Sequence, residues 1–174
     1  MNLRRPAAFF DRDGILNQDS GYVFRSEQFR WCEGAIEAIK SLNDRRYLVF
    51  VVTNQAGIAH GYYGEESVQA LHRWMSAELA KEGAHIDGFY YCPHHPNGRR
   101  KEYAIDCDCR KPNPGMLLAA MREWEVDREH SFFIGDKESD LQAAKAASVH
   151  GILWRKGDVR DAVNEAIRAT VHGK

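Results

Sequence analysis

The stretch Phe9-Phe10-Asp11-Arg12-Asp13-Gly14-Ile15-Leu16-Asn17 places two acidic residues, two positions apart, directly after a short apolar run. The run Ala7–Phe10 is typical of a strand that is covered on both faces of a parallel sheet. Ligands bind at the carboxyl ends of such strands, where one carboxylate can hold a metal or attack an electrophile while the other transfers a proton. The alternative is an ordinary Asp- and Gly-rich turn, because these residues are common in turns.

Similar apolar runs recur along the chain, and segments with helical spacing separate them. The predicted strands are Ala7–Phe10, Tyr47–Val52, Gly88–Tyr91, Ser131–Ile134 and Gly151–Trp154. The predicted helices cover residues 36–42, 68–79, 117–121, 141–147 and 159–167. This alternation predicts an α/β fold, a Rossmann-like, doubly wound, mostly parallel sheet with helices on both faces. We expect a single domain over residues 1–174.

The amino-acid composition limits the kinds of molecule that we expect the protein to bind. Hydrophobic residues make up 44% and charged residues 28% of the 174 residues, as in ordinary soluble globular proteins. The formal net charge is -1 and no region is strongly basic, so nucleic acid is not an expected partner. The longest apolar runs are far shorter than the roughly 18 residues of a membrane span. We therefore expect a cytoplasmic monomer that acts on a small molecule and binds no membrane.

Polar residues follow the other predicted strands as well. Thr53 and Asn54 come directly after the second strand, and Asp136 and Lys137 after the fourth. Carboxylates, a hydroxyl group and a lysine thus converge on one edge of the sheet. The alternative interpretations are that Thr53 and Asn54 cap a helix or form a turn, and that Lys137 is a solvated surface lysine.

Four short motifs in a fixed order make the chain similar to the haloacid dehalogenase superfamily of phosphatases. The motifs are Asp11-x-Asp13-Gly14, Thr53-Asn54, Lys111 and Gly135-Asp136-x-x-x-Asp140, which together cover nearly the whole chain. The resemblance implies that Asp11 attacks phosphorus and forms an aspartyl-phosphate. An aspartate with the ordinary pKa of about 3.9 is already ionised at neutral pH and needs no base to activate it.

The same resemblance implies the remaining roles. Asp13 would protonate the departing oxygen and later deprotonate the attacking water, for which its surroundings should raise its pKa. Mg²⁺ would be held by Asp11, the backbone carbonyl of Asp13 and Asp136. Lys111, the Thr53 hydroxyl and the Asn54 backbone would hold the other phosphate oxygens.

Two residues of this group each have alternative roles. We expect Asp140 to contact Lys137 or Asn54, or else to reach the metal ion through water. Lys137 is expected to bind phosphate if it is not a solvated surface residue.

A second group of candidate ligands consists of Cys92-Pro93-His94 and, after twelve intervening residues, Cys107-Asp108-Cys109. Two close pairs separated by a loop have the spacing of a tetrahedral structural Zn²⁺ site, here a loop over residues 92–109. Four protein ligands leave no open position for catalysis. His95 competes with His94 as a ligand, but the ligand-x-ligand step and the resemblance favour His94. The alternative is buried free cysteines with His94 at the surface.

The segments between the predicted strands leave no room for a cap domain. Specificity should then come from three loops, residues 18–25, 58–64 and 96–106. Arg110 lies between a zinc ligand and Lys111 and could bind a second phosphate of a sugar bisphosphate. The run 99–101 is also basic, but a solvated loop explains it equally well.

The resemblance extends to a capless, zinc-containing subgroup that includes heptose bisphosphate phosphatases and histidinol-phosphate phosphatases. The long zinc loop, together with Tyr22, His60 and Gly61, is more similar to the heptose enzymes, which implies a phosphorylated sugar substrate and a role in lipopolysaccharide core synthesis. Ile15 departs from the usual threonine. A zinc-stabilised binding module without activity and a 3′-phosphatase of nucleic-acid ends are the alternatives from other functional classes.

Overall fold

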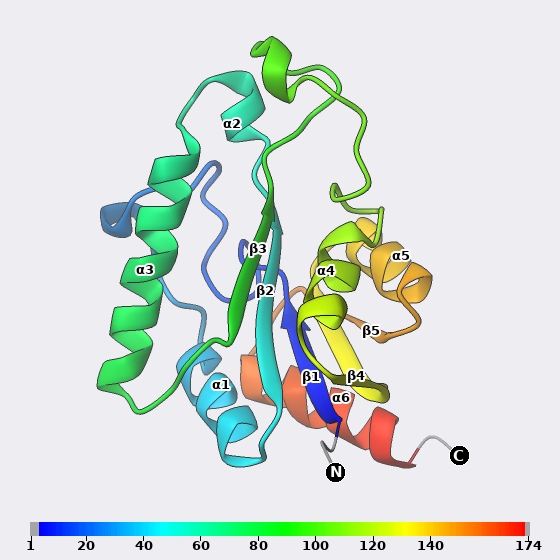
Figure 1. Ribbon diagram of the computed structural model, residues 1–174. Helices are drawn as coiled ribbons and strands as arrows, with labels where there is room; N and C mark the ends of the chain where they lie inside the picture. The colour runs from blue at the N-terminus through cyan, green and yellow to red at the C-terminus, as the bar shows by residue number, and fades with distance from the viewer. Residues whose placement is uncertain (1–3, 173–174) are drawn as a thin grey trace.

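A computed structural model describes residues 4–172 and contains one five-stranded parallel sheet (Figure 1). Its strands are β1 (Arg5–Phe10), β2 (Leu48–Asn54), β3 (Gly88–Cys92), β4 (Val126–Gly135) and β5 (His150–Leu153). Their order across the sheet is β3-β2-β1-β4-β5. The predicted α/β, doubly wound, parallel architecture is therefore confirmed.

Helices cover both faces of the sheet (Figure 1). They are α1 (Ala35–Asp44), α2 (Gly57–His60), α3 (Glu65–Lys81), α4 (Gly115–Glu123), α5 (Glu138–Ala146) and α6 (Val159–His172), with short 3-10 helices η1 (Ser26–Gln28) and η2 (Lys101–Tyr103). Helices α1, α3 and α6 pack on one face, and α4 and α5 on the other. The sequence did not predict α2, because four residues are too few to produce a helical apolar period.

Alternate residues of each strand belong to different hydrophobic cores. In β1, Ala8 and Phe10 face the core shared with α1, α3 and α6, whereas Ala7 and Phe9 face the core shared with α4 and α5. This follows from the two-residue period of a strand. Both phenylalanines are fully buried, and each such side chain contributes roughly 1.5 to 3 kcal/mol to stability.

The order in which the strands are added across the sheet reverses between β1 and β4, which makes this position the switch point of the sheet. The chain runs from β1 outward to β2 and β3, and β4 then returns to the other side of β1, where Phe10 lies opposite Ile134. The amide of Asp11 donates to the carbonyl of Ile134 at 3.0 Å. Residues that follow β1 and β4 therefore lie together at the position where open α/β sheets bind ligands.

Some strand boundaries differ from the predicted ones. β4 begins at Val126, five residues before the predicted Ser131, because its start pairs with Arg5 of β1 even though residues 127–130 are polar. Thr53 and Asn54 are the last residues of β2 rather than residues after it. Pairing with a neighbouring strand extends both elements beyond the apolar runs that the sequence displays.

The connections between strands in residues 4–172 contain at most two helices each. The β1–β2 segment contains only η1 and α1, and the β2–β3 segment only α2 and α3. Neither contains a separate cap. Among the described helices, none has the length and apolar composition that crossing a bilayer requires.

Candidate active site

Asp11 follows β1 and is almost completely buried. Its Oδ1 accepts a hydrogen bond from the Arg12 amide at 2.9 Å and lies 3.0 Å from Lys111 Nζ. Burial raises the pKa of Asp11 to about 7, although the Lys111 ammonium group lowers it. Without a bound cation, the pKa of Asp11 therefore lies above the ordinary value that was assumed from the sequence, because the sequence does not reveal this burial. A cation bound beside the carboxylate would lower the pKa again.

Lys111 connects the two sides of the switch point. Its Nζ lies 2.8 Å from Asp140 Oδ1 and 3.0 Å from Asp11 Oδ1, and it donates to the Val52 carbonyl at 2.9 Å. Burial lowers the pKa of Lys111, but the negative charges of Asp11 and Asp140 outweigh this effect and raise the pKa above its ordinary value. The Asn54 side chain fixes the lysine backbone, donating to its carbonyl at 3.2 Å and accepting from its amide at 3.0 Å.

The side chains of Asp11, Asp136 and Asp140 bring carboxylate oxygens within 4.8 Å of one another. Asp140 uses both of its oxygens: Oδ1 pairs with Lys111, and Oδ2 accepts from the amides of Asp136 and Lys137, each at 3.1 Å. Asp140 thus contacts the Lys137 backbone, as expected, and Lys111, which was not expected. Together with Lys111, these three aspartates are called the carboxylate site below.

Asp136 provides the free ligand atom of the carboxylate site. Its Oδ1 is buried without a hydrogen-bond partner, whereas a buried carboxylate oxygen normally has one. Gly14 leaves room for this side chain, because a Cβ at Gly14 would lie 2.3 Å from Asp136 Oδ2 and its φ of +90° also favours glycine. An unpaired carboxylate oxygen beside a second carboxylate fits a hard cation such as Mg²⁺.

Asp13 is surrounded by hydrogen-bond donors that the sequence did not single out. Asn17 Nδ2 donates to Oδ1 at 3.0 Å, Gln55 Nε2 donates to Oδ2 at 3.1 Å, and the Arg12 guanidinium group contacts both oxygens. The Tyr63 hydroxyl orients Gln55 by donating to its Oε1 at 2.7 Å. Gln55 could have been suspected, since it follows Thr53-Asn54 directly, whereas no local pattern indicates Tyr63.

A cavity of about 550 Å³ opens above the carboxylate site. Its lining includes five predicted site residues: Asp13, Asn54, Arg110, Lys111 and Lys137. Tyr22 of the first predicted specificity loop also lines it. Asp11 and Thr53 are buried, and the Thr53 hydroxyl accepts from Gln55 Nε2 at 2.9 Å. Four of the five predicted phosphate-binding residues thus line one cavity, and the fifth, Thr53, is buried.

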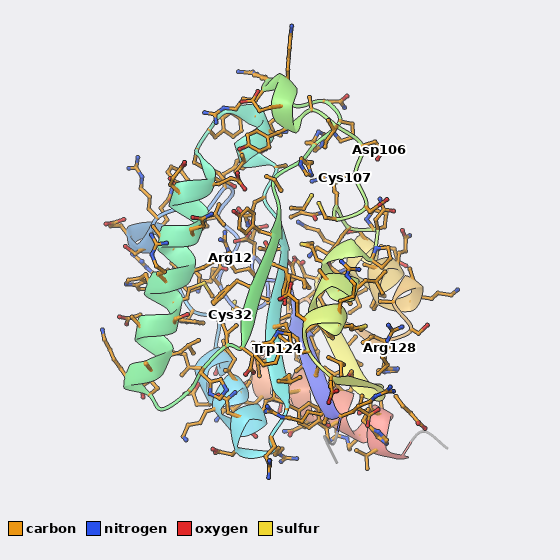
Figure 2. The ribbon with its side chains drawn as sticks, viewed as in Figure 1. Arg12, Cys32, Asp106, Cys107, Trp124 and Arg128 are labelled. Atoms are coloured by element: carbon orange, nitrogen blue, oxygen red, sulfur yellow. The ribbon has the colours of Figure 1, made fainter. Side chains whose placement is uncertain are left out.

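The four predicted zinc ligands, Cys92, His94, Cys107 and Cys109, form a second cluster, called the Cys/His cluster below. Cys107 lies in the loop above α4 (Figure 2). The Sγ atoms of Cys92 and Cys107 are 3.5 Å apart, those of Cys107 and Cys109 3.4 Å, and His94 Nδ1 is 3.7 and 3.4 Å from the Sγ atoms of Cys92 and Cys109.

These separations fit four ligands around one tetrahedral Zn²⁺, for which Zn–S bonds of about 2.3 Å place neighbouring sulfurs roughly 3.8 Å apart. One pair, Cys92 and Cys109, is closer at 2.8 Å, yet all cysteines are free. His94, and not His95, belongs to the cluster. The Cys/His cluster could therefore bind zinc with no protein ligand position left open.

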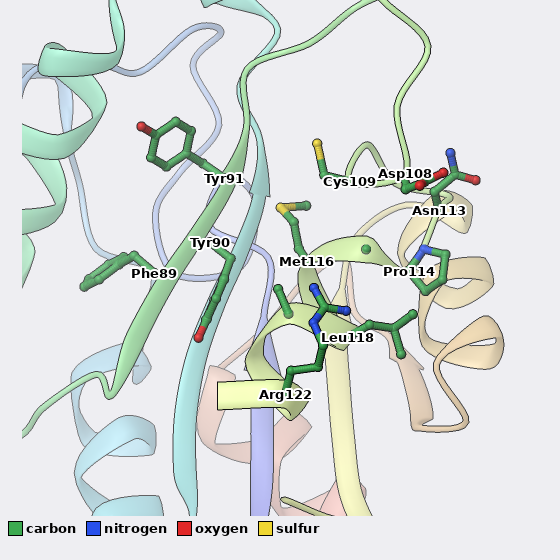
Figure 3. Close-up of a pocket in the computed structure, with 12 residues that line it drawn as sticks. Phe89, Tyr90, Tyr91, Asp108, Cys109, Asn113, Pro114, Met116, Leu118 and Arg122 are labelled. Atoms are coloured by element: carbon green, nitrogen blue, oxygen red, sulfur yellow. The ribbon is translucent and has the colours of Figure 1, made fainter. Parts of the chain in front are cut away.

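A larger cavity of about 680 Å³ lies elsewhere, between β3 and α4 (Figure 3). Tyr90, Met116, Leu118 and Arg122 are among its lining residues, and Cys109 is the only zinc-ligand candidate among them. It contains no residue of the carboxylate site. Volume alone therefore does not identify the active site, which is marked by the buried charges at the switch point.

The fold and the carboxylate site define a phosphatase of the haloacid dehalogenase class. Residues 108–172 match the HAD-hydrolase-like family model. The chain is 48% identical over 156 residues to D-glycero-beta-D-manno-heptose-1,7-bisphosphate 7-phosphatase of Rhodopseudomonas palustris, covering 90% of this chain and 87% of the relative. The Pasteurella multocida protein of the same name is 50% identical, covering 87% and 82%. The chain therefore belongs to the family of these phosphoric monoester hydrolases.

A solved structure supports the same assignment and the metal ion. D,D-heptose 1,7-bisphosphate phosphatase from B. bronchiseptica, in complex with magnesium and phosphate, aligns with a TM-score of 0.77 and 33% identity over 92% of this chain and 86% of that chain. The three-aspartate group of the present protein fits a magnesium site. Magnesium and zinc are thus both compatible with the residues that the two clusters provide.

Proposed function

We propose that the protein removes the 7-phosphate of D-glycero-β-D-manno-heptose 1,7-bisphosphate in the synthesis of the lipopolysaccharide core. The observation that carries the proposal is the carboxylate site beneath a cavity lined by cationic side chains, in a chain that is 44% identical or more to several phosphatases named for this substrate. The β anomer follows the names of those relatives.

Asp11 is proposed as the nucleophile that forms the aspartyl-phosphate. Its carboxylate is held by the Arg12 amide and by Lys111, so its orientation is fixed before the substrate arrives. Lys111 donates all three of its N–H bonds to protein acceptors, and it must release one of them to contact a phosphate oxygen. Thr53 and the Asn54 backbone would hold the remaining oxygens at the end of β2.

Asp13 is proposed as the general acid for the departing oxygen and as the general base for the water that hydrolyses the aspartyl-phosphate. The donors from Arg12, Asn17 and Gln55 fix the direction of its carboxyl group. Asp11, Asp136 and the Asp13 carbonyl would hold Mg²⁺, which when bound neutralises charge between the anionic nucleophile and the anionic phosphate.

Arg110 is proposed to bind the phosphate that remains on the sugar. It lines the cavity next to Lys111, and its Nη1 donates to the His94 carbonyl at 3.3 Å. This contact anchors the guanidinium group to the Cys/His cluster. A guanidinium group can form two parallel hydrogen bonds with a phosphate, which favours a bisphosphate over a monophosphate.

We further propose that residues 1–174 act as one phosphatase domain, as a monomer in the cytoplasm, without nucleic acid or membrane as a partner. The single sheet, with at most two helices between successive strands, and the near-neutral charge support this proposal. Light scattering of the purified protein during turnover would test the monomer.

Phosphate release from three substrates tests the function: the heptose bisphosphate, histidinol phosphate and a nicked oligonucleotide with a 3′-phosphate. We expect kcat/KM to be highest for the heptose bisphosphate. A higher value for histidinol phosphate or for the oligonucleotide would contradict the proposed substrate, and no release from any of them would favour a binding module.

A further inference from the structure

Arg12 is the largest of the fully buried side chains in the described part of the protein. It lies inside the molecule between α3 and the sheet (Figure 2). A guanidinium group is always charged, and burying its charge is unfavourable unless a counter-charge and hydrogen-bond acceptors surround it. The groups that surround Arg12 must therefore supply the counter-charge and the hydrogen-bond acceptors that its buried guanidinium group requires.

One carboxylate neutralises this buried charge. Arg12 Nη2 contacts Asp13 Oδ1 and Oδ2 at 3.1 and 3.2 Å, and Nε contacts Oδ1 at 3.3 Å. Within residues 4–172, Asp13 is the only acidic residue at ion-pair distance from Arg12. Nη2 also donates to the Val23 carbonyl at 2.5 Å, which connects the guanidinium group to the loop that contains Tyr22. Arg12, together with Asn17 and Gln55, thus fixes the direction of the Asp13 carboxyl group.

His72 of α3 completes the environment of Arg12 from a position sixty residues further along the chain. Arg12 Nη1 lies 3.3 Å from His72 Nε2. Because arginine can only donate, Nε2 must be the acceptor, so the ring is neutral with its proton on Nδ1. The ring stacks on Phe89 of β3 at 4.5 Å and 18°. Burial and the Arg12 charge lower the pKa of His72 to about 3, in agreement with a neutral ring.

We infer that His72 is a positioning residue of the hydrolysis, which holds the Arg12 guanidinium group and, through it, the Asp13 carboxyl group at the departing oxygen. This inference rests on the proposed role of Asp13 as general acid. Without the acceptor on His72, one buried N–H of Arg12 loses its partner and the guanidinium group can rotate toward other acceptors. Proton transfer requires correct geometry, so loss of the His72 acceptor should slow the proton transfer from Asp13 to the departing oxygen.

Two variants separate the acceptor from the packing of the ring. His72→Phe retains a ring against Phe89 but has no acceptor, whereas His72→Gln can place an amide oxygen near the position of Nε2. Each is assayed as the metal-loaded enzyme on the heptose bisphosphate and on p-nitrophenyl phosphate, whose leaving group departs without a proton. The ratio kcat/KM includes only the steps up to that departure, so the later role of Asp13 as a base does not enter.

We expect His72→Phe to lower kcat/KM for the heptose bisphosphate about tenfold, a part of the roughly 10²- to 10⁴-fold that general acid–base catalysis supplies. For p-nitrophenyl phosphate the loss should stay below about twofold. His72→Gln should recover most of the loss. Arg73→Ala, on the exposed side of α3, is the control and should change neither substrate.

An equal loss on both substrates, or no loss on either, would overturn the inference. Asp13→Asn shows whether a negative result concerns His72 or the proposed function. If Asp13→Asn causes no selective loss on the heptose bisphosphate, the assignment of Asp13 as general acid is itself wrong. The ¹⁵N resonances of the His72 ring provide a test in the unaltered protein that does not depend on activity or on folding of a variant. A proton on Nε2 would contradict the inference, and a proton on Nδ1 alone supports it.

Discussion

The carboxylate site and the Cys/His cluster both gather ionisable side chains at one edge of the sheet, yet they are built in opposite ways. In the carboxylate site, Asp11 and Asp140 share one lysine that lines an open cavity, and Asp136 keeps an oxygen without a partner. In the Cys/His cluster, the four ligand atoms face one another. A site that binds and releases substrate requires an unused ligand atom, whereas a structural site uses all of them.

The two sites are nevertheless joined along the chain. Cys109 belongs to the Cys/His cluster and Lys111 to the carboxylate site, with Arg110 between them. Substitutions in the carboxylate site, in the Cys/His cluster and around the cavity should therefore affect different properties. The effect should be largest in the carboxylate site and smallest around the cavity.

The largest effect is expected for Asp11→Asn, which removes the nucleophile. Turnover should fall by about 10⁴-fold or more, as for other variants that lose a nucleophile. The fold should persist, because Asp140 still pairs with Lys111. Phosphate release and thermal melting measure the two properties. Substantial activity in a correctly folded variant would show that the carboxylate site does not act through covalent catalysis.

Mild treatment with EDTA should distinguish the two metals. We expect activity to disappear and to return with added Mg²⁺, because a few carboxylates hold this ion loosely. Zinc should remain bound to three thiolates and an imidazole, and Tm should stay within about 2 °C, which for a protein of this size corresponds to less than about 1 kcal/mol. Elemental analysis before and after treatment provides the measurement.

Cys109→Ser provides the matched comparison for EDTA treatment. It should lower zinc content and Tm, and added Mg²⁺ should not restore the lost stability. If purified protein contained no zinc at all, the Cys/His cluster would not be a zinc site.

Arg110→Ala should have an intermediate effect that depends on substrate. Charge-assisted hydrogen bonds contribute roughly 1.5 to 3 kcal/mol, which corresponds to about ten- to a hundredfold in kcat/KM. We expect this loss for the heptose bisphosphate and a much smaller one for the matched monophosphate. Equal losses for both substrates would assign Arg110 to the transferred phosphate or to the structure of the loop.

Lys137→Ala should have the smallest effect. The lysine is exposed at the cavity and makes its hydrogen bond to Asp140 with its backbone. We expect kcat/KM to fall roughly two- to fivefold at low ionic strength and the difference to diminish in high salt, because exposed charges are screened. A loss that does not depend on salt would instead indicate a direct contact with the transferred phosphate.

The sequence predicted those parts of the fold and site that short patterns determine. Continuous apolar runs located the core of the five strands, and Asp11, Lys111 and Asp136 were singled out because each matches a motif of the superfamily that the chain resembles. The start of β4 at Val126 was missed, since pairing with β1 and not side-chain composition creates it.

Apart from Gln55, the side chains that fix the surroundings of Asp13 could not be predicted for the same physical reason. His72 contacts Arg12 across sixty residues, and Tyr63 reaches Gln55 through the loop after α2, so no local spacing indicates either pair. The pKa of Asp11 depends on burial by segments from several parts of the chain. Such contacts exist only once the sheet has formed.

The central position of β1 also determines when the protein can fold during its synthesis. The ribosome makes β1 first, but one of its two neighbours, β4, ends at Gly135. Until that segment has emerged, one edge of β1 has no partner, and an unpaired strand edge is prone to association with other chains. Asp11 and Asp136, which follow β1 and β4, cannot meet before then. The nascent chain therefore remains inactive, with an exposed strand edge, at least until translation has passed Asp136.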